Sequence, residues 1–201
     1  YEKVSIFIQT YITLNDIILK SNDEFLKDYY IEIDCFYELI DKYKKEYFSY
    51  NFKIELEKTY QIIIDKINKY SDTKKINDFI IDYNNLTENI KIWNKEFIKT
   101  EMDKYNEYFS NISGKNLDYQ QREAIVVDEV NNLILAGAGC GKTLTIASKV
   151  KYLIEKKGIK PNEILLISFT KKAANEMSER ITLFTEKNIQ ANTFHKLGFD
   201  I

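Results

Sequence analysis

The residues with the clearest chemical meaning lie between Leu133 and Thr143, a segment that reads Leu-Ile-Leu-Ala-Gly-Ala-Gly-Cys-Gly-Lys-Thr. Gly137, Gly139 and Gly141 allow the backbone to turn and to approach an anion without the clash of a Cβ atom. The N–H groups of such a turn, and the N-terminus of the helix that follows it, direct partial positive charge at a phosphate. The sequence of apolar strand, glycine-rich turn and helix therefore predicts a phosphate-binding loop.

Two side chains at the end of this segment add chemistry to the predicted loop. Lys142 carries a full positive charge that can reach the outer phosphates of a nucleotide, and the hydroxyl of Thr143 can ligate Mg²⁺. This spacing is the Walker A pattern, except that Ala136 stands where the strict pattern has glycine. We therefore assign catalytic roles to Lys142 and Thr143, with Thr143 also as the metal ligand. The residues expected to hold the nucleotide phosphates are Gly137, Ala138, Gly139, Cys140, Gly141, Lys142 and Thr143.

The composition of the 201-residue chain changes near residue 115. All six glycines, the single proline and every alanine lie at or after Gly114, whereas fourteen of the fifteen tyrosines lie at or before Tyr119. A long stretch without helix breakers, with apolar residues three and four positions apart, is typical of long helices. We therefore expect an α-helical accessory domain over residues 1–114 and a second domain over residues 115–201.

Three apolar stripes indicate helices in the first domain, packed as hairpins around an aromatic and isoleucine core. The stripes lie within residues 25–40, 54–67 and 79–102, and breaks are expected near residues 21–22, 49–51, 71–72 and 111–114. The aromatic side chains could also form a platform for stacked bases, but burial in a core is the favoured interpretation. The lysines of this part are matched by aspartates and glutamates, which is typical of a solvated surface.

The second part alternates predicted strands and helices, as in an α/β nucleotide-binding domain with a parallel sheet. The expected strands cover residues 133–135, 164–168 and 189–192, and the expected helices cover residues 142–156 and 171–184. Gly158 follows the first of these helices at the position where helices commonly end. Three strands are too few to complete such a sheet, so we expect part of a P-loop NTPase domain of the RecA-like type.

Charge and cysteine content exclude several classes of protein. The net charge of −2 argues against a general polyanion binder, so any contact with nucleic acid has to be a local patch. Cys35 and Cys140 suggest neither a disulfide framework nor a metal site, which favours a reducing cytoplasm. No apolar run of about 18 residues and no signal peptide is visible, so no membrane partner is expected. The chain starts without Met and stops at Ile201, which indicates an N-terminal fragment of a longer protein.

Four segments resemble, in order, motifs of the UvrD/Rep-type superfamily 1 helicases. They are Leu117–Ile125, similar to the Q motif, Ala136–Thr143, similar to motif I, Ile164–Ile181, similar to motif Ia, and Thr193–Gly198, similar to the next DNA-contacting motif. Cys140 replaces the usual serine, and Lys171 replaces the usual asparagine. The resemblance covers residues 115–201 and implies an ATP-dependent DNA helicase or translocase, with ATP and Mg²⁺ as cofactors.

The resemblance also implies roles for individual residues. Gln121 would hold the adenine, because a Gln amide can donate and accept a hydrogen bond at once. Phe169 would stack on a base of single-stranded DNA, and stacking tolerates any base. Taken alone, Phe169 would be interpreted as a core residue at a strand end and His195 as a structural histidine. The other residues expected to contact single-stranded or partly duplex DNA are Thr170, Lys171, Thr193 and His195.

Residues 93–114 resemble the segment ahead of the Q motif in helicase IV-like members of this family, which implies that subtype. Three roles for the helical domain stay open: binding of duplex DNA, recruitment of a protein partner and bracing of the motor domain. The residues themselves do not distinguish these roles.

Hydrolysis needs a carboxylate for the Mg²⁺ shell and a charge stabiliser for the transferring phosphoryl group. The resemblance implies that these groups come from segments beyond Ile201. Ala124–Glu129 has the form of a Walker B strand, but it precedes the loop and its apolar residues continue a helix from Gln121. We therefore expect this chain alone to bind nucleotide weakly and not to hydrolyse it.

Two other classes of protein remain as alternatives. The chain could be a P-loop nucleotide switch or scaffold whose helical part binds a partner. It could also be a small-molecule P-loop kinase, which leaves Phe169 and the Thr-Phe-His segment unexplained.

Overall fold

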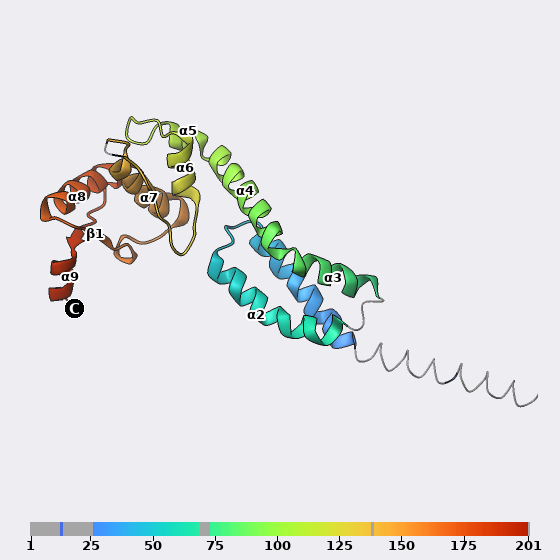
Figure 1. The fold of residues 1–201 in the computed structure, drawn as a ribbon. Coiled ribbons are helices and arrows are strands. Elements are labelled where there is room, and N and C mark those ends of the chain that lie inside the picture. The colour runs from blue at the N-terminus through green and yellow to red at the C-terminus, as the bar shows by residue number, and fades with distance from the viewer. Residues whose placement is uncertain (1–12, 14–25, 69–72, 138, 201) are drawn as a thin grey trace, which may run out of the picture. The chain divides into compact units, whose positions relative to one another are not determined.

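The computed structural model describes residues 13, 26–68, 73–137 and 139–200, with the elements labelled in Figure 1. It forms two compact units, one up to Lys95 and one from Glu96 onward. The boundary between them falls within helix α4 (Leu86–Lys104), whereas the change of composition at residue 115 coincides with a turn. The domain limits 1–114 and 115–201 remain a prediction. Among the described residues, no helix is long and apolar enough to cross a membrane.

The first unit is a set of helices whose ends follow from the local sequence. It contains a helix over residues 26–43, α2 (Tyr50–Ile67), α3 (Lys74–Asn84) and the start of α4. Ser49 is the N-cap of α2, because its hydroxyl accepts a hydrogen bond from the Phe52 backbone N–H at 3.3 Å. This cap confirms the break predicted near residues 49–51. The breaks predicted near residues 21–22 and 71–72 lie outside the described residues.

The third predicted stripe, over residues 79–102, is not one continuous helix. α3 ends at Asn84 and α4 begins at Leu86, with Asn85 between them at φ −91° and ψ 3°. Asn side chains compete with the helical backbone for hydrogen bonds, so two consecutive asparagines weaken a helix at this point. The prediction is right about the buried positions, since Phe79 and Leu86 are both buried, and wrong about the continuity.

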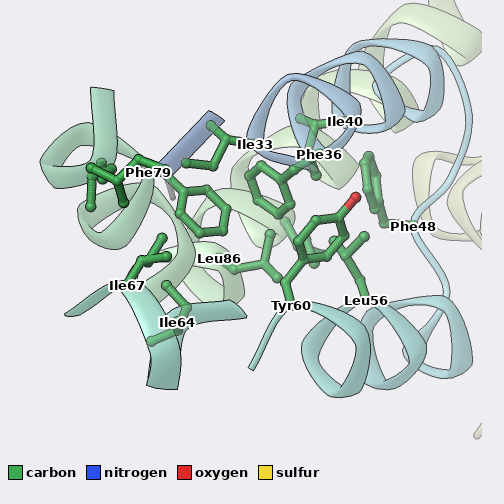
Figure 2. Packing of buried hydrophobic residues seen from close by; sticks show 13 residues of the cluster. Ile33, Phe36, Ile40, Phe48, Leu56, Tyr60, Ile64, Ile67, Phe79 and Leu86 are labelled. Carbon is green, nitrogen blue, oxygen red and sulfur yellow. The ribbon is translucent and has the colours of Figure 1, made fainter. Parts of the chain in front are cut away.

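Aromatic rings fill the core of the first unit (Figure 2). The ring of Phe36 meets the rings of Tyr60 and Phe79 edge-on, with centroids 4.9 and 5.1 Å apart. Edge-to-face pairs of this kind add about 0.5–1.5 kcal/mol beyond the burial of apolar area. These aromatic residues are therefore core side chains, as the sequence favoured, and not a surface for stacked bases. Aliphatic side chains from each helix of the unit complete the cluster, among them Ile33, Ile64, Ile76 and Leu86.

The second unit combines helices with a small parallel sheet. The strands β1 (Leu166–Ser168) and β2 (Ala191–Thr193) pair with Leu166 beside Ala191 and Ser168 beside Thr193. Helix α8 (Lys171–Thr185) connects the two strands, and α7 (Lys142–Lys157) packs against both α6 (Tyr119–Val126) and α8. After α4 the unit runs through α5 (Asn106–Ser110), α6 (Tyr119–Val126), α7 (Lys142–Lys157), the short 3₁₀ helix η2 (Pro161–Glu163), β1 (Leu166–Ser168), α8 (Lys171–Thr185), β2 (Ala191–Thr193) and α9 (Phe194–Asp200).

Most elements predicted for the second unit are confirmed. α7 and α8 match the helices predicted over 142–156 and 171–184. Gly158 ends α7 in the left-handed region at φ 72°, where glycine is preferred. The strands predicted over 164–168 and 189–192 are present as the shorter β1 and β2, with β2 extending one residue further. Their parallel pairing agrees with the predicted parallel sheet.

The prediction of a strand over residues 133–135 is wrong. These residues have no regular secondary structure, and Leu133 and Leu135 are 82% and 85% exposed. An apolar strand is stable only when neighbouring strands pair with its backbone and neighbouring helices cover its side chains. Among the described residues the sheet consists of β1 and β2 alone, so residues 133–135 have no strand beside them.

Candidate nucleotide and nucleic-acid site

The glycine-rich loop, residues 136–143, leads directly into α7. Gly139 and Gly141 have φ values of 80° and 78°, in the left-handed region that L side chains rarely adopt. Gly141 is the N-cap of α7, and no side chain caps the first turn of this helix. The first N–H groups of α7 therefore remain available to an anion at the positive end of the helix dipole. Ala138 lies outside the described residues.

Lys142 folds back over the loop that precedes it. Its Nζ donates to the backbone carbonyls of Ala136 at 2.8 Å and of Gly137 at 2.7 Å. Both bonds are at the surface, so the ammonium group is held at the loop without being buried. Thr143 is half-buried in the first turn of α7, and Cys140 is exposed in the loop. A phosphate at the loop would meet the ammonium group at short range and would replace the two carbonyls as its partner.

Gln121 lies against this loop although it belongs to another helix. Its Nε2 lies 2.7 Å from the position that a Cβ atom on Gly141 would occupy. Its backbone N–H donates to Asp118 Oδ1 at 2.9 Å, and its Oε1 accepts from the Asp118 N–H at 3.1 Å, which forms a capping box at the start of α6. This cap was not predicted from the sequence, although an Asp three residues before a Gln is its usual signal.

Lys149, in the middle of α7, holds the other end of α6. Its Nζ donates to the backbone carbonyls of Ile125 at 2.6 Å and of Val127 at 2.7 Å. Burial lowers the pKa of Lys149, and the nearby charge of Asp128 opposes this shift. The carbonyls at a helix C-terminus lack partners within the helix, so a lysine placed there completes their hydrogen bonding. No sequence signal identifies this contact, because its partners are backbone atoms of a different helix.

Arg122, on α6, forms hydrogen bonds to α5 and to the segment between α5 and α6. Its guanidinium donates to the Leu117 carbonyl at 2.8 Å and to Asn106 Oδ1 at 2.8 Å. It also donates to Ser110 Oγ at 3.0 Å and to Asn116 Oδ1 at 2.9 Å. A guanidinium with four such bonds has a structural role, which ties α6 to α5 and to the turn between them.

The apolar run that precedes Asp128 and Glu129 is helical. Residues up to Val126 belong to α6, and Ile125 and Val126 are both buried. This confirms that the run continues the helix from Gln121 and is not a Walker B strand.

The predicted DNA-contacting residues come together at the carboxyl ends of the paired strands. Phe169 follows β1 and is 91% exposed, and Lys171 is exposed at the start of α8. Phe194 follows β2 and is 68% exposed, with the exposed His195 next to it. Ser168 and Thr193 are paired, so the two phenylalanines leave the sheet at the same edge. No role was predicted for Phe194 from the sequence.

The two threonines at this edge have structural roles. Thr170 is the N-cap of α8, and its Oγ1 accepts from the Ala173 N–H at 3.1 Å. Thr193 is buried, and its Oγ1 accepts from the Lys196 N–H at 3.3 Å. A pocket of about 710 Å³ lies beside Thr193, and its lining also includes Lys171 and Lys196.

The sequence of residues 117–201 matches the family model described as UvrD/REP helicase N-terminal domain. DNA helicase IV of Escherichia coli (strain K12) is 37% identical over 110 residues, which are 54% of this chain and 16% of that protein. The ATP-dependent DNA helicase PcrA of Staphylococcus epidermidis is 40% identical over 86 residues, 41% of this chain and 12% of that protein. The ATP-dependent DNA helicase Rep of Buchnera aphidicola subsp. Schizaphis graminum is 41% identical over 90 residues, 43% of this chain and 14% of that protein.

Residues 117–201 are therefore similar to the N-terminal domain of UvrD/REP helicases, which agrees with the resemblance of the four motifs. The chain spans less than one fifth of the length of these three relatives.

Proposed function

We propose that the full-length protein is an ATP-driven DNA helicase or translocase. The family match and the relatives named as DNA helicases support this class. The single observation that carries the proposal is the approach of Gln121 Nε2 to Gly141, which brings an amide that can both donate and accept hydrogen bonds beside a glycine-rich loop at a helix N-terminus.

In this proposal the glycine-rich loop binds ATP. The N–H groups of Gly137, Ala138, Gly139, Cys140 and Gly141 surround the phosphates, and the Lys142 ammonium turns from its loop carbonyls to the outer phosphates. The hydroxyl of Thr143 ligates Mg²⁺, and the Gln121 amide pairs with the adenine edge. The open first turn of α7 and the position of Lys142 Nζ at the loop fit such a ligand.

The same proposal assigns single-stranded DNA to the carboxyl edge of β1 and β2. Phe169 stacks on a base, while Thr170, Lys171, Thr193 and His195 contact the strand further along. A stacked base contributes about 1–3 kcal/mol and requires no particular sequence, as a moving enzyme needs. The 91% exposure of Phe169 is compatible with this role, because it leaves the face of the ring open to a base.

We further propose a helicase IV-like subtype. The match to the Escherichia coli helicase IV covers 110 residues, more than the 85 from residue 117 to residue 201, so it extends into the segment before residue 117. In that segment Glu101 accepts hydrogen bonds from Tyr152 at 2.6 Å and from Lys157 at 2.9 Å, both on α7. These contacts favour a bracing role for the end of α4.

A regulatory nucleotide switch with a helical partner-binding module is the alternative function. The test is ATP hydrolysis by the full-length protein with and without single-stranded DNA. The helicase proposal expects strong stimulation by DNA, loss of turnover in Lys142→Ala, and weaker stimulation in Phe169→Ala. ATP binding without DNA-stimulated turnover would favour the switch.

A further inference from the structure

Helix α6 lies against α7 at both of its ends, but only one end is hydrogen-bonded there. At the start of α6, Gln121 Nε2 lies 2.7 Å from the position that a Cβ atom on Gly141 would occupy, which is a close approach without a bond. At its end, Lys149 Nζ donates to the carbonyls of Ile125 and Val127 at 2.6 and 2.7 Å. With a rise of 1.5 Å per residue, Gly141 and Lys149 are about 12 Å apart along α7. The bonds made by Lys149 therefore hold α6 in a position where Gln121 lies beside the glycine-rich loop.

The contact made by Lys149 is specific to the helix that carries Gln121. Lys151, two residues further along α7, makes the same kind of contact with α8, where its Nζ donates to the carbonyl of Phe184. Two lysines of α7 thus donate hydrogen bonds to the C-terminal carbonyls of two neighbouring helices. Removing Lys151 should disturb only the contact between α7 and α8, whereas removing Lys149 should displace α6. Comparing the two variants therefore separates a general loss of helix packing from a specific displacement of α6.

We infer that Lys149 is a positioning residue for recognition of the nucleotide base. By holding the end of α6, it keeps the Gln121 amide at the loop in one orientation. This inference rests on the proposed function, in which Gln121 reads adenine. Without Lys149, α6 keeps its capping box and its Arg122 bonds but loses its hydrogen bonds to α7, so Gln121 can shift away from the base.

The experiment measures the preference of the full-length enzyme for ATP over GTP, as the ratio of the two kcat/KM values with a single-stranded oligonucleotide present. Lys149→Met keeps an unbranched side chain only one atom shorter and removes the donors. We expect it to lower the preference about tenfold, the range of one lost base-reading pair. The change should arise in the KM for ATP and not in kcat, because the phosphate-binding residues are untouched.

Three further variants make the result specific. Lys149→Arg keeps the charge and the donors and should restore most of the preference. Lys151→Met breaks the matched contact to α8 and should leave the preference within about twofold of wild type. Gln121→Ala should itself lose the preference, and adding Lys149→Met to it should lower the preference no further.

Two results overturn the inference. One is a Lys149→Met enzyme with the wild-type preference, and the other is an equal loss of kcat with both nucleotides. If Lys149→Met does not fold, Lys149→Gln replaces it, since its shorter uncharged amide cannot bond both carbonyls, and an unchanged preference again overturns the inference. An active wild type that uses ATP and GTP equally overturns the inference alone. A wild type without DNA-stimulated hydrolysis overturns the proposed function.

Discussion

Gly141 shows how a single residue can satisfy two requirements at once. Its φ of 78° lies in the left-handed region, and its missing Cβ makes room for the amide of Gln121. Gly158, at the other end of α7, has a similar φ of 72° but nothing within 4 Å of its Cβ position. Two glycines with nearly the same φ, at the two ends of one helix, therefore differ in whether a side chain lies close to the missing Cβ atom.

This difference predicts unequal effects of the same substitution. Gly158→Ala should cost about 1 kcal/mol of stability from backbone strain and leave nucleotide affinity unchanged. Gly141→Ala should carry the same strain and also displace Gln121, so ATP affinity should fall at least about fivefold. Thermal unfolding and ATP titration of the full-length variants measure the two quantities. Equal ATP affinity in both variants would show that the Gln121 contact has no role in binding.

At the scale of elements, the end of α4 is tied to α7 by a buried carboxylate. Glu101 is 7% exposed and accepts hydrogen bonds from Tyr152 and Lys157. Burial by itself raises the pKa of Glu101, but the bonds from Tyr152 and Lys157 and the charges of Lys157 and Lys104 outweigh it and hold the pKa below its ordinary 4.5. Burial and the bond to Glu101 raise the pKa of Tyr152.

The lowered pKa of Glu101 makes the contact between α4 and α7 sensitive to acid. A carboxylate with a lowered folded-state pKa stabilises the fold above its unfolded pKa, and this contribution is lost as the pH falls through the folded pKa. Glu101→Gln should therefore cost about 2 kcal/mol at pH 7, and its difference from wild type should shrink below pH 4.5. Unfolding curves at pH 7 and below pH 4.5 test this, with the exposed Glu96→Gln on the same helix as the control. A difference that stays constant with pH would contradict it.

Elements with a strong local pattern could be predicted from the sequence, and contacts between elements could not. The periodicity of apolar residues identified α2, α7 and α8, and Gly158 marked the end of α7. Residues 133–135 were misassigned because apolar character indicates a strand only when partners are present. Within the candidate site, local motifs predicted the glycine-rich loop, and the family resemblance singled out Phe169; their functional roles remain predictions. Lys149, Arg122 and Glu101 were missed because their partners lie on other elements, and nothing in the local sequence identifies such partners.

At the scale of the whole chain, the net charge of −2 gives these 201 residues little general attraction for DNA. In our proposal their affinity for a single strand comes from local contacts, the ring of Phe169 and the ammonium of Lys171. These two contacts differ in physical origin. Neutralising a phosphate releases counterions and makes binding depend on salt, whereas stacking on a ring does not.

A salt titration of oligonucleotide binding by the full-length protein should therefore distinguish the contributions of the two contacts to affinity. Lys171→Ala should reduce the slope of log affinity against log salt by about 0.7, the value for one phosphate contact on a single strand. Phe169→Leu should weaken binding by about 1–3 kcal/mol at every salt concentration and leave the slope unchanged. Lys66→Ala, at the exposed end of α2, is the control and should change neither quantity. A slope that falls in Lys66→Ala would assign DNA contact to the helical unit, and a slope unchanged in Lys171→Ala would remove Lys171 from the proposed interface.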